Sequence, residues 1–135
     1  MDNRIVVDTS VALKWFVEEE GSKKARKILE QYKSGSLEIL APEIIGLELA
    51  NALFYGVSLK GKRLKEAIEL FYSLGLSLVP LDRLFIQEAA SLMEKVNIAI
   101  YDCLFIALAE KEKIPLVTAD TRHHQKRFSQ YIQPL

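Results

Sequence analysis

Four acidic residues stand beside or within runs of apolar residues, where a globular chain seldom places a charge. They are Asp8, Glu48, Asp102 and Asp120. Burying a carboxylate costs free energy unless a partner, hydrogen bonds or a metal ion compensates for it. Four such positions in one short chain predict a shared acidic pocket that binds a divalent cation.

The residue types indicate which cation. The pattern offers oxygen ligands without a Cys-His set, so it favours Mg²⁺ or Mn²⁺ over zinc. Crowded carboxylates raise one another's pKa, and a bound cation keeps them ionised. The hydroxyls of Ser10 and Thr118 lie two residues from Asp8 and Asp120. They are expected to orient a carboxylate, a water or a phosphate oxygen, although an ordinary turn or strand hydroxyl is an equal alternative.

Each acid also has a purely structural interpretation. Asp8 and Asp120 can cap helices that follow strands, although neither has the Glu or Gln three residues later that marks a capping box. Asp102 can cap a helix that begins at Cys103, and Glu48 can pair with a buried Lys or Arg. All four interpretations would have to hold independently, whereas one shared site explains the acids together.

The composition predicts a single domain spanning residues 1–135, because half of the 135 residues are hydrophobic. The single cysteine, Cys103, excludes a disulfide framework, and residues 1–4 lack the architecture of a signal peptide. We therefore expect a cytoplasmic protein. Eighteen basic residues balance eighteen acidic ones, so any nucleic-acid contact must be local. The candidates for binding RNA are Lys14, Arg122, Lys126 and Arg127.

Strands alternate with helices along the chain, which predicts an α/β fold with a mostly parallel sheet covered on both faces. Strands are expected at 4–8, 37–40, 76–80, 116–119 and near 131–132, and helices at 9–18, 23–33, 42–56, 63–74, 82–96 and 97–113. Asp8 and Asp120 then lie at the carboxyl ends of strands, where open α/β sheets bind ligands. Glu48 falls on the apolar face of its helix, and Asp102 lies in a helix that is apolar nearly all round. No glycine-rich phosphate loop follows the first strand.

Four segments, in this order, resemble the motifs of PIN-domain ribonucleases, specifically the toxins of VapBC toxin–antitoxin pairs. The segments are residues 6–16, 42–53, 101–110 and 116–120. The resemblance implies a three-layer α/β/α sandwich in which Asp8, Glu48, Asp102 and Asp120 are the catalytic and metal-binding acids, with Ser10 and Thr118 as supporting hydroxyls. It also implies Mg²⁺- or Mn²⁺-dependent RNA cleavage, a homodimer and a small cognate antitoxin. Residues 121–124 depart from the family's usual aromatic or Arg-Phe pair.

The leading hypothesis is a metal-dependent endoribonuclease in which water held by Mg²⁺ attacks an RNA phosphodiester. The alternative is a non-catalytic PIN-like module that recruits RNA or a protein partner. A third hypothesis is a phosphatase with Asp8 as nucleophile. It is weakened because position 10 is Ser, where an enzyme of the Asp-x-Asp type has a second Asp.

Overall fold

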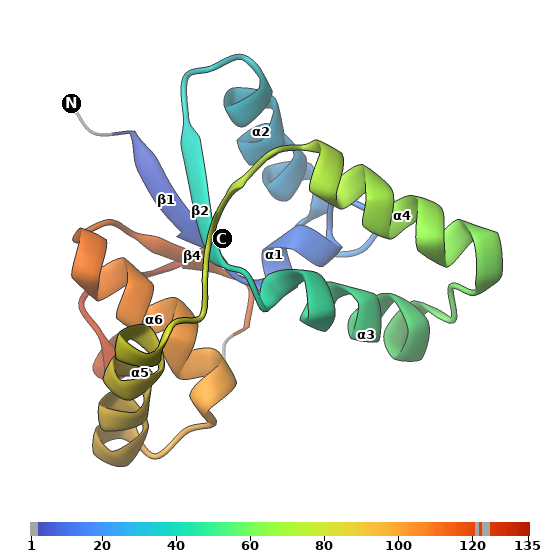
Figure 1. Ribbon diagram of the computed structural model, residues 1–135. Coiled ribbons are helices and arrows are strands. Elements are labelled where there is room, and N and C mark those ends of the chain that lie inside the picture. Colours follow the sequence, from blue (N-terminus) through green and yellow to red (C-terminus); the bar gives the residue numbers. More distant parts are fainter. Residues whose placement is uncertain (1–2, 121, 123–124) are drawn as a thin grey trace.

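A parallel five-stranded sheet with the strand order β3-β2-β1-β4-β5 forms the centre of the molecule (Figure 1). The computed structural model describes residues 3–120, 122 and 125–135. In chain order the elements are β1 (Arg4–Val7), α1 (Thr9–Leu13), α2 (Ser22–Lys33), β2 (Glu38–Pro42), α3 (Ile45–Val57), α4 (Gly61–Ser73), β3 (Ser77–Val79), α5 (Arg83–Val96), α6 (Ile100–Glu112), β4 (Leu116–Thr118), the 3₁₀ turn η1 (Lys126–Phe128) and β5 (Ile132–Pro134).

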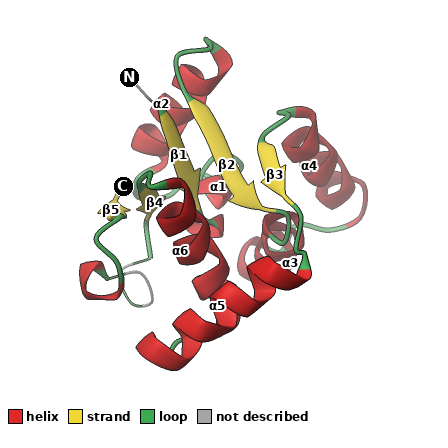
Figure 2. Cartoon of the chain, turned by 60° about the vertical axis from the view of Figure 1, so that its left-hand side comes forward, coloured by secondary structure: helices red, strands yellow, loops and turns green. Residues whose placement is uncertain are grey.

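Helices cover both faces of this sheet. In Figure 2, α5 and α6 lie in front of the strands, and α1 and α2 lie behind them. Helix α6 packs on β1, β2 and β4 and is covered in turn by α5. All residues of α6 from 103 to 109 are therefore buried, as the apolar sequence of this helix predicts. The predicted three-layer α/β/α sandwich is confirmed, and all four strand pairings among the described residues are parallel.

The register between β1 and β4 brings together residues that are far apart in the sequence. Val6 pairs with Leu116 and Val7 pairs with Val117, because these apolar residues fill two adjacent strands in the centre of the sheet, as is usual when both faces are covered. One step further, Asp8 therefore lies beside Thr118. The arrowheads of β1 and β2 point toward α3 (Figure 2), so α3 lies at the edge of the sheet where the acids are expected.

Helices α3 and α4 lie side by side and extend away from the sheet (Figure 1). Their packing requires a glycine near the start of α3. A Cβ atom at Gly46 would lie 1.8 Å from the Tyr72 hydroxyl oxygen on α4. The side chain of Leu53 is fully buried and that of Leu49 is 1% exposed; together they anchor the inner face of α3, and this fixes the direction in which Glu48 points.

Element boundaries lie within three residues of the sequence prediction, except at the end of the first helix. The first helix ends at Leu13 rather than near residue 18, and residues 14–16 continue as tight turns closed by i to i+3 hydrogen bonds. Pro42 ends β2 rather than opening α3. A proline fits there because the Glu43 amide donates to Val79 beside β2, so the preceding position faces β1, and the pairing of β2 with β1 ends at Leu40. Among the described residues, no helix is long and apolar enough to cross a membrane.

Candidate active site

The four predicted acids line one cleft at the carboxyl edge of the sheet. The cavity has a volume of about 560 Å³. Each acid comes from a different part of the fold: Asp8 follows β1, Glu48 lies on α3, Asp102 lies on α6 and Asp120 follows β4. Residues separated by more than a hundred positions thus meet at one place, as the sequence pattern predicts for a shared pocket.

Asp8 is the most buried of the four, with 3% of its surface exposed, and the protein fixes both of its oxygens. Ser10 Oγ donates a hydrogen bond to Oδ1 over 2.5 Å, and Thr118 Oγ1 donates one to Oδ2 over 2.5 Å. The Val11 amide also donates to Oδ1, over 3.3 Å, so Asp8 caps α1 as well. Asp8 therefore caps a helix and also lines the shared cleft, so both interpretations of this residue are correct.

The two supporting hydroxyls lie where the sequence places them, and they connect Asp8 to Asp120. The Asp120 amide donates to Thr118 Oγ1 over 3.0 Å, and the Ala119 amide donates to Ser10 Oγ over 2.9 Å. Each hydroxyl therefore donates a hydrogen bond to Asp8 and accepts one from a backbone amide, that of Ala119 or that of Asp120. This network holds the ends of β1 and β4 in a fixed relation.

Thr9 is a site residue that the sequence reasoning missed. Its Oγ1 donates a hydrogen bond to Glu48 Oε1 over 2.8 Å. The first helix therefore holds the second acid, because Thr9 opens α1 directly after Asp8 and α1 packs against α3. The one sequence feature that could have identified Thr9 is its hydroxyl next to Asp8, and a hydroxyl close to Asp8 is also the feature that identifies Ser10.

Asp102 and Asp120 are half-buried in the walls of the cleft. Asp102 lies in the first turn of α6, whose N-cap is Ala99, so Asp102 does not cap that helix. Asp120 Oδ1 accepts a hydrogen bond from the Arg122 amide over 2.9 Å. The cleft is also lined by Asn51 and Phe105, each three residues beyond an acid on the same helix, and by the exposed Tyr101.

The donor set fits a hard divalent cation, because four carboxylates from separate elements supply only oxygen ligands. Among the described residues, however, no three His, Cys, Asp or Glu side chains stand close enough together to form a ready-made metal-binding group. The acids line an open cleft rather than a closed cage. Mg²⁺ commonly keeps several waters and takes only one or two protein carboxylates, so an open acidic cleft suits it.

Cys103 follows Asp102 but takes no part in the cleft. The side chain is fully buried, and its Sγ donates to the carbonyl of Ile98 over 3.7 Å. Burial, and secondarily the negative charge of Asp102, raise the pKa of the Cys103 thiol to about 11. The thiol is therefore protonated at neutral pH and packs as a small apolar side chain.

Three of the four candidate RNA-binding residues share a second cavity. Arg122, Lys126 and Arg127 line a space of about 780 Å³. Lys14 lies in neither cavity: its Nζ donates to the Glu20 carbonyl over 2.6 Å and lies 3.6 Å from Glu19 Oε2. The remaining residues of the 121–124 segment, Thr121, His123 and His124, lie outside the described residues.

Solved structures with the same fold include toxin–antitoxin proteins. The chain of the VapBC2 complex of Rickettsia felis, bound to a DNA fragment from its promoter, has a TM-score of 0.70 at 18% identity, with 98% of each chain covered. VapC20 of Mycobacterium tuberculosis, described as a Sarcin-Ricin loop cleaving toxin, has a TM-score of 0.69 at 14% identity, covering 88% of this chain and 92% of that one. A toxin–antitoxin complex from Klebsiella pneumoniae has a TM-score of 0.66 at 12% identity, with 90% of each chain covered.

At these identities the solved structures establish the fold. No curated protein matches this chain in sequence. The sequence model of the PIN domain family, in contrast, matches residues 5–129, which include all four acids and both supporting hydroxyls. The predicted resemblance is therefore confirmed, and this chain belongs to the PIN domain family.

Proposed function

We propose that this chain is a Mg²⁺- or Mn²⁺-dependent endoribonuclease, the toxin of a toxin–antitoxin pair, acting on RNA in the cytoplasm. The observation that carries the proposal is the convergence of Asp8, Glu48, Asp102 and Asp120 on one cleft. Membership of the PIN domain family and the shared fold with toxins such as VapC20 support it.

The roles of the residues follow from how each is held. Asp8 is the fixed ligand, because Ser10, Thr118 and the Val11 amide set the direction of both oxygens. Glu48, Asp102 and Asp120 complete the acidic wall around the space where a phosphodiester would lie. When bound, the cation supplies positive charge at the phosphodiester oxygens and lowers the pKa of a coordinated water. The four acids hold that charge in place and do not attack the substrate.

Purified protein is expected to cut RNA when Mg²⁺ or Mn²⁺ is present and to leave it intact in EDTA. Total cellular RNA is the suitable substrate, with the 5′ ends of the fragments mapped by sequencing in both conditions. Discrete cut sites that appear only with the cation support an endoribonuclease. Binding of RNA without any cleavage would instead identify a PIN-like binding module.

A substitution at Thr9 gives a second test of the proposed metal site, because the Thr9 hydroxyl donates a hydrogen bond to Glu48. Thr9→Val keeps the shape of the side chain and removes the donor to Glu48 Oε1. Loss of such a supporting bond typically costs about 10- to 100-fold in metal affinity or activity, and we expect an effect in this range. Mn²⁺ affinity, measured by calorimetry, reports the effect independently of cleavage.

Thr9→Ser is the matched control, since it keeps the hydroxyl. Serine should restore most of the Mn²⁺ affinity that valine removes. Equal losses in the two variants would show that Thr9 acts through packing of α1 rather than through Glu48.

We further propose a small antitoxin and a second copy of the chain as protein partners. Apolar side chains are exposed at the rim of the cleft: Leu47 is 74% exposed on α3 and Tyr101 is 55% exposed on α6. The outer face of α3 also exposes Tyr55, which is 77% exposed. Exposed apolar patches commonly mark protein interfaces. The toxin–antitoxin complexes among the structures of the same fold support an antitoxin partner.

A further inference from the structure

A second cavity beside the acidic cleft concentrates positive charge in a chain with no net charge. Its lining includes Lys95 at the end of α5, together with Arg122, Lys126 and Arg127. Glu110 is the one carboxylate among its lining residues within the described part of the chain. We refer to this cavity, defined by these four cations, as the basic pocket.

The four cations are not neutralised by the described protein. None of the ion pairs formed within residues 3–120, 122 and 125–135 involves Lys95, Arg122, Lys126 or Arg127. Lys14 differs, because it is engaged by Glu19 and the Glu20 carbonyl. Among the described lining residues of this pocket, four cations face one carboxylate, so the positive charges repel one another, and an anionic ligand relieves this repulsion.

Local contacts connect the residues that carry the cations of the basic pocket. The Arg127 guanidinium carbon lies 4.9 Å from the centre of the Phe128 ring, so the ring fixes one cation by a cation–π contact. Gln125 Nε2 donates to the Arg122 carbonyl over 3.2 Å, and the Phe128 amide donates to the Gln125 carbonyl over 2.8 Å. These bonds link Arg122 to the 3₁₀ turn that carries Lys126 and Arg127.

The basic pocket adjoins the acidic cleft where a hydrogen bond joins Asp120 to Arg122. Asp120 lines the cleft and Arg122 lines the basic pocket, and the Arg122 amide donates to the Asp120 carboxylate over 2.9 Å. Guanidinium groups bind phosphodiester oxygens well, because their planar donors match the phosphate geometry. A ligand that spans both cavities must present a phosphate to the cations on one side and the scissile group to the cleft on the other. A single-stranded RNA meets both requirements with its repeating phosphates.

We infer that the basic pocket is a subsite for the RNA strand, where it binds the phosphodiester backbone beside the segment in the cleft. This inference rests on the proposed ribonuclease function. The pocket then provides affinity and register but no part of the cleavage chemistry, because phosphate contacts position a nucleic acid without reading its bases.

The test uses the full chain carrying Asp8→Asn, so that RNA binding is measured without cleavage, and buffer without divalent cations, so that no metal bridge contributes. The ligand is a fluorescein-labelled single-stranded oligoribonucleotide followed by fluorescence anisotropy. Lys126→Ala combined with Arg127→Ala removes two cations. The logarithm of the binding constant falls linearly with the logarithm of the salt concentration, and each phosphate contact to a single strand contributes about 0.7 to the magnitude of this slope. We therefore expect the double variant to lower the slope by about 1.4 and to weaken binding roughly 25-fold at 0.1 M salt.

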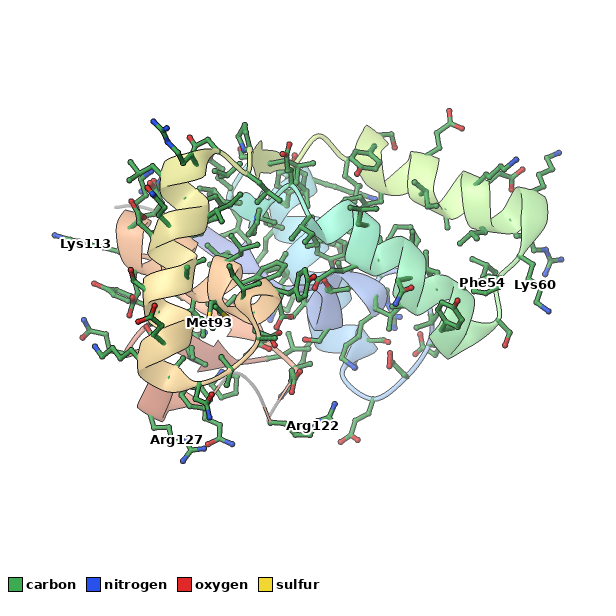
Figure 3. All side chains as sticks on the ribbon, turned by 60° about the horizontal axis from the view of Figure 1, so that its bottom comes forward. Phe54, Lys60, Met93, Lys113, Arg122 and Arg127 are labelled. Carbon is green, nitrogen blue, oxygen red and sulfur yellow. The ribbon has the colours of Figure 1, made fainter. Side chains whose placement is uncertain are left out.

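The chain offers a matched control at a distance. Lys60→Ala combined with Arg63→Ala removes the same charge from exposed residues at the start of α4. Figure 3 shows Lys60 near the far end of the α3–α4 pair, away from the edge that carries Arg122 and Arg127. Binding by this control should change by no more than about twofold, because distant charges are screened in salt.

In the unsubstituted background, the Lys126/Arg127 double variant should raise KM while leaving kcat close to its original value, as expected when only ground-state binding is lost. Unchanged affinity of the double variant, or an equal loss in the Lys60/Arg63 control, would overturn the inference. So would tight binding of polyglutamate at this pocket with no binding of RNA, which would indicate an acidic protein segment instead. Absence of cleavage by the unsubstituted chain counts against the proposed function alone, because the anisotropy measurement does not depend on it.

Discussion

Asp8→Asn is expected to lower the rate of RNA cleavage by roughly a thousandfold or more, since a catalytic metal contributes several kcal/mol of transition-state stabilisation. The asparagine keeps the shape of the carboxylate but removes its charge. Asp8 is the acid whose two oxygens are both fixed by hydrogen bonds described here. No other acid in the cleft can move into its place, because each is carried by a different element.

The substitution should leave the fold intact. Asparagine caps helices about as well as aspartate, so the bond from the Val11 amide can persist. Hydroxyl groups can accept as well as donate, and Thr118 Oγ1 can therefore turn its hydrogen away and accept a hydrogen bond from the new amide group. We expect the free energy of unfolding to change by no more than about 1 kcal/mol.

Asp82→Asn provides the matched control for this prediction. Asp82 also caps a helix, accepting a hydrogen bond from the Phe85 amide over 2.9 Å at the start of α5, but it does not line the cleft. Asp82→Asn should leave the rate of RNA cleavage unchanged. The two variants are compared by single-turnover RNA cleavage and by thermal unfolding. Substantial cleavage by folded Asp8→Asn protein would contradict the proposed mechanism.

The placement of the acids could be predicted from the sequence because simple periodicities determine it. Asp8 and Asp120 follow short apolar strands, and parallel strands end at one edge of a sheet. Glu48 falls on the apolar side of its helix, and the buried residues Leu49 and Leu53 keep that side turned inward. The convergence on one cleft then follows from the parallel topology, which the alternation of strands and helices predicts.

The hydrogen bonds between distant residues could not be predicted in the same way. The bond between Thr9 and Glu48 depends on how α1 packs against α3, and the bond between Thr118 and Asp8 depends on the register of β1 and β4. The end of α1 at Leu13 is also a tertiary effect: Trp15 Nε1 donates to the Ala25 carbonyl of α2, and this holds the chain in a turn. Proline is favoured in the first turn of a helix, so the sequence predicts a helix from residue 42, whereas Pro42 ends β2 in the structure.

Divalent cations are expected to stabilise the protein as well as to activate it. Four carboxylates in one cleft repel one another, and a bound cation replaces this repulsion with attraction. A ligand that binds only the folded state at 100 times its Kd adds about 2.7 kcal/mol to the free energy of unfolding. For a chain of this length, that corresponds to a rise in Tm of about 10 °C. Thermal unfolding in a MgCl₂ or MnCl₂ titration measures the rise.

The specificity of this effect distinguishes a metal site from general screening of charge. Sodium chloride at equal ionic strength should give a much smaller rise, because screening acts on all exposed charges alike and only weakly on buried ones. Asp8→Asn and Glu48→Gln should each reduce the rise caused by the cation, whereas Asp82→Asn should leave it unchanged. An equal rise in all three variants would place the cation elsewhere and remove the physical basis for grouping the acids. A rise that depends on Asp8 and Glu48 but comes without RNA cleavage would keep the metal site and make the chain a metal-dependent binding module.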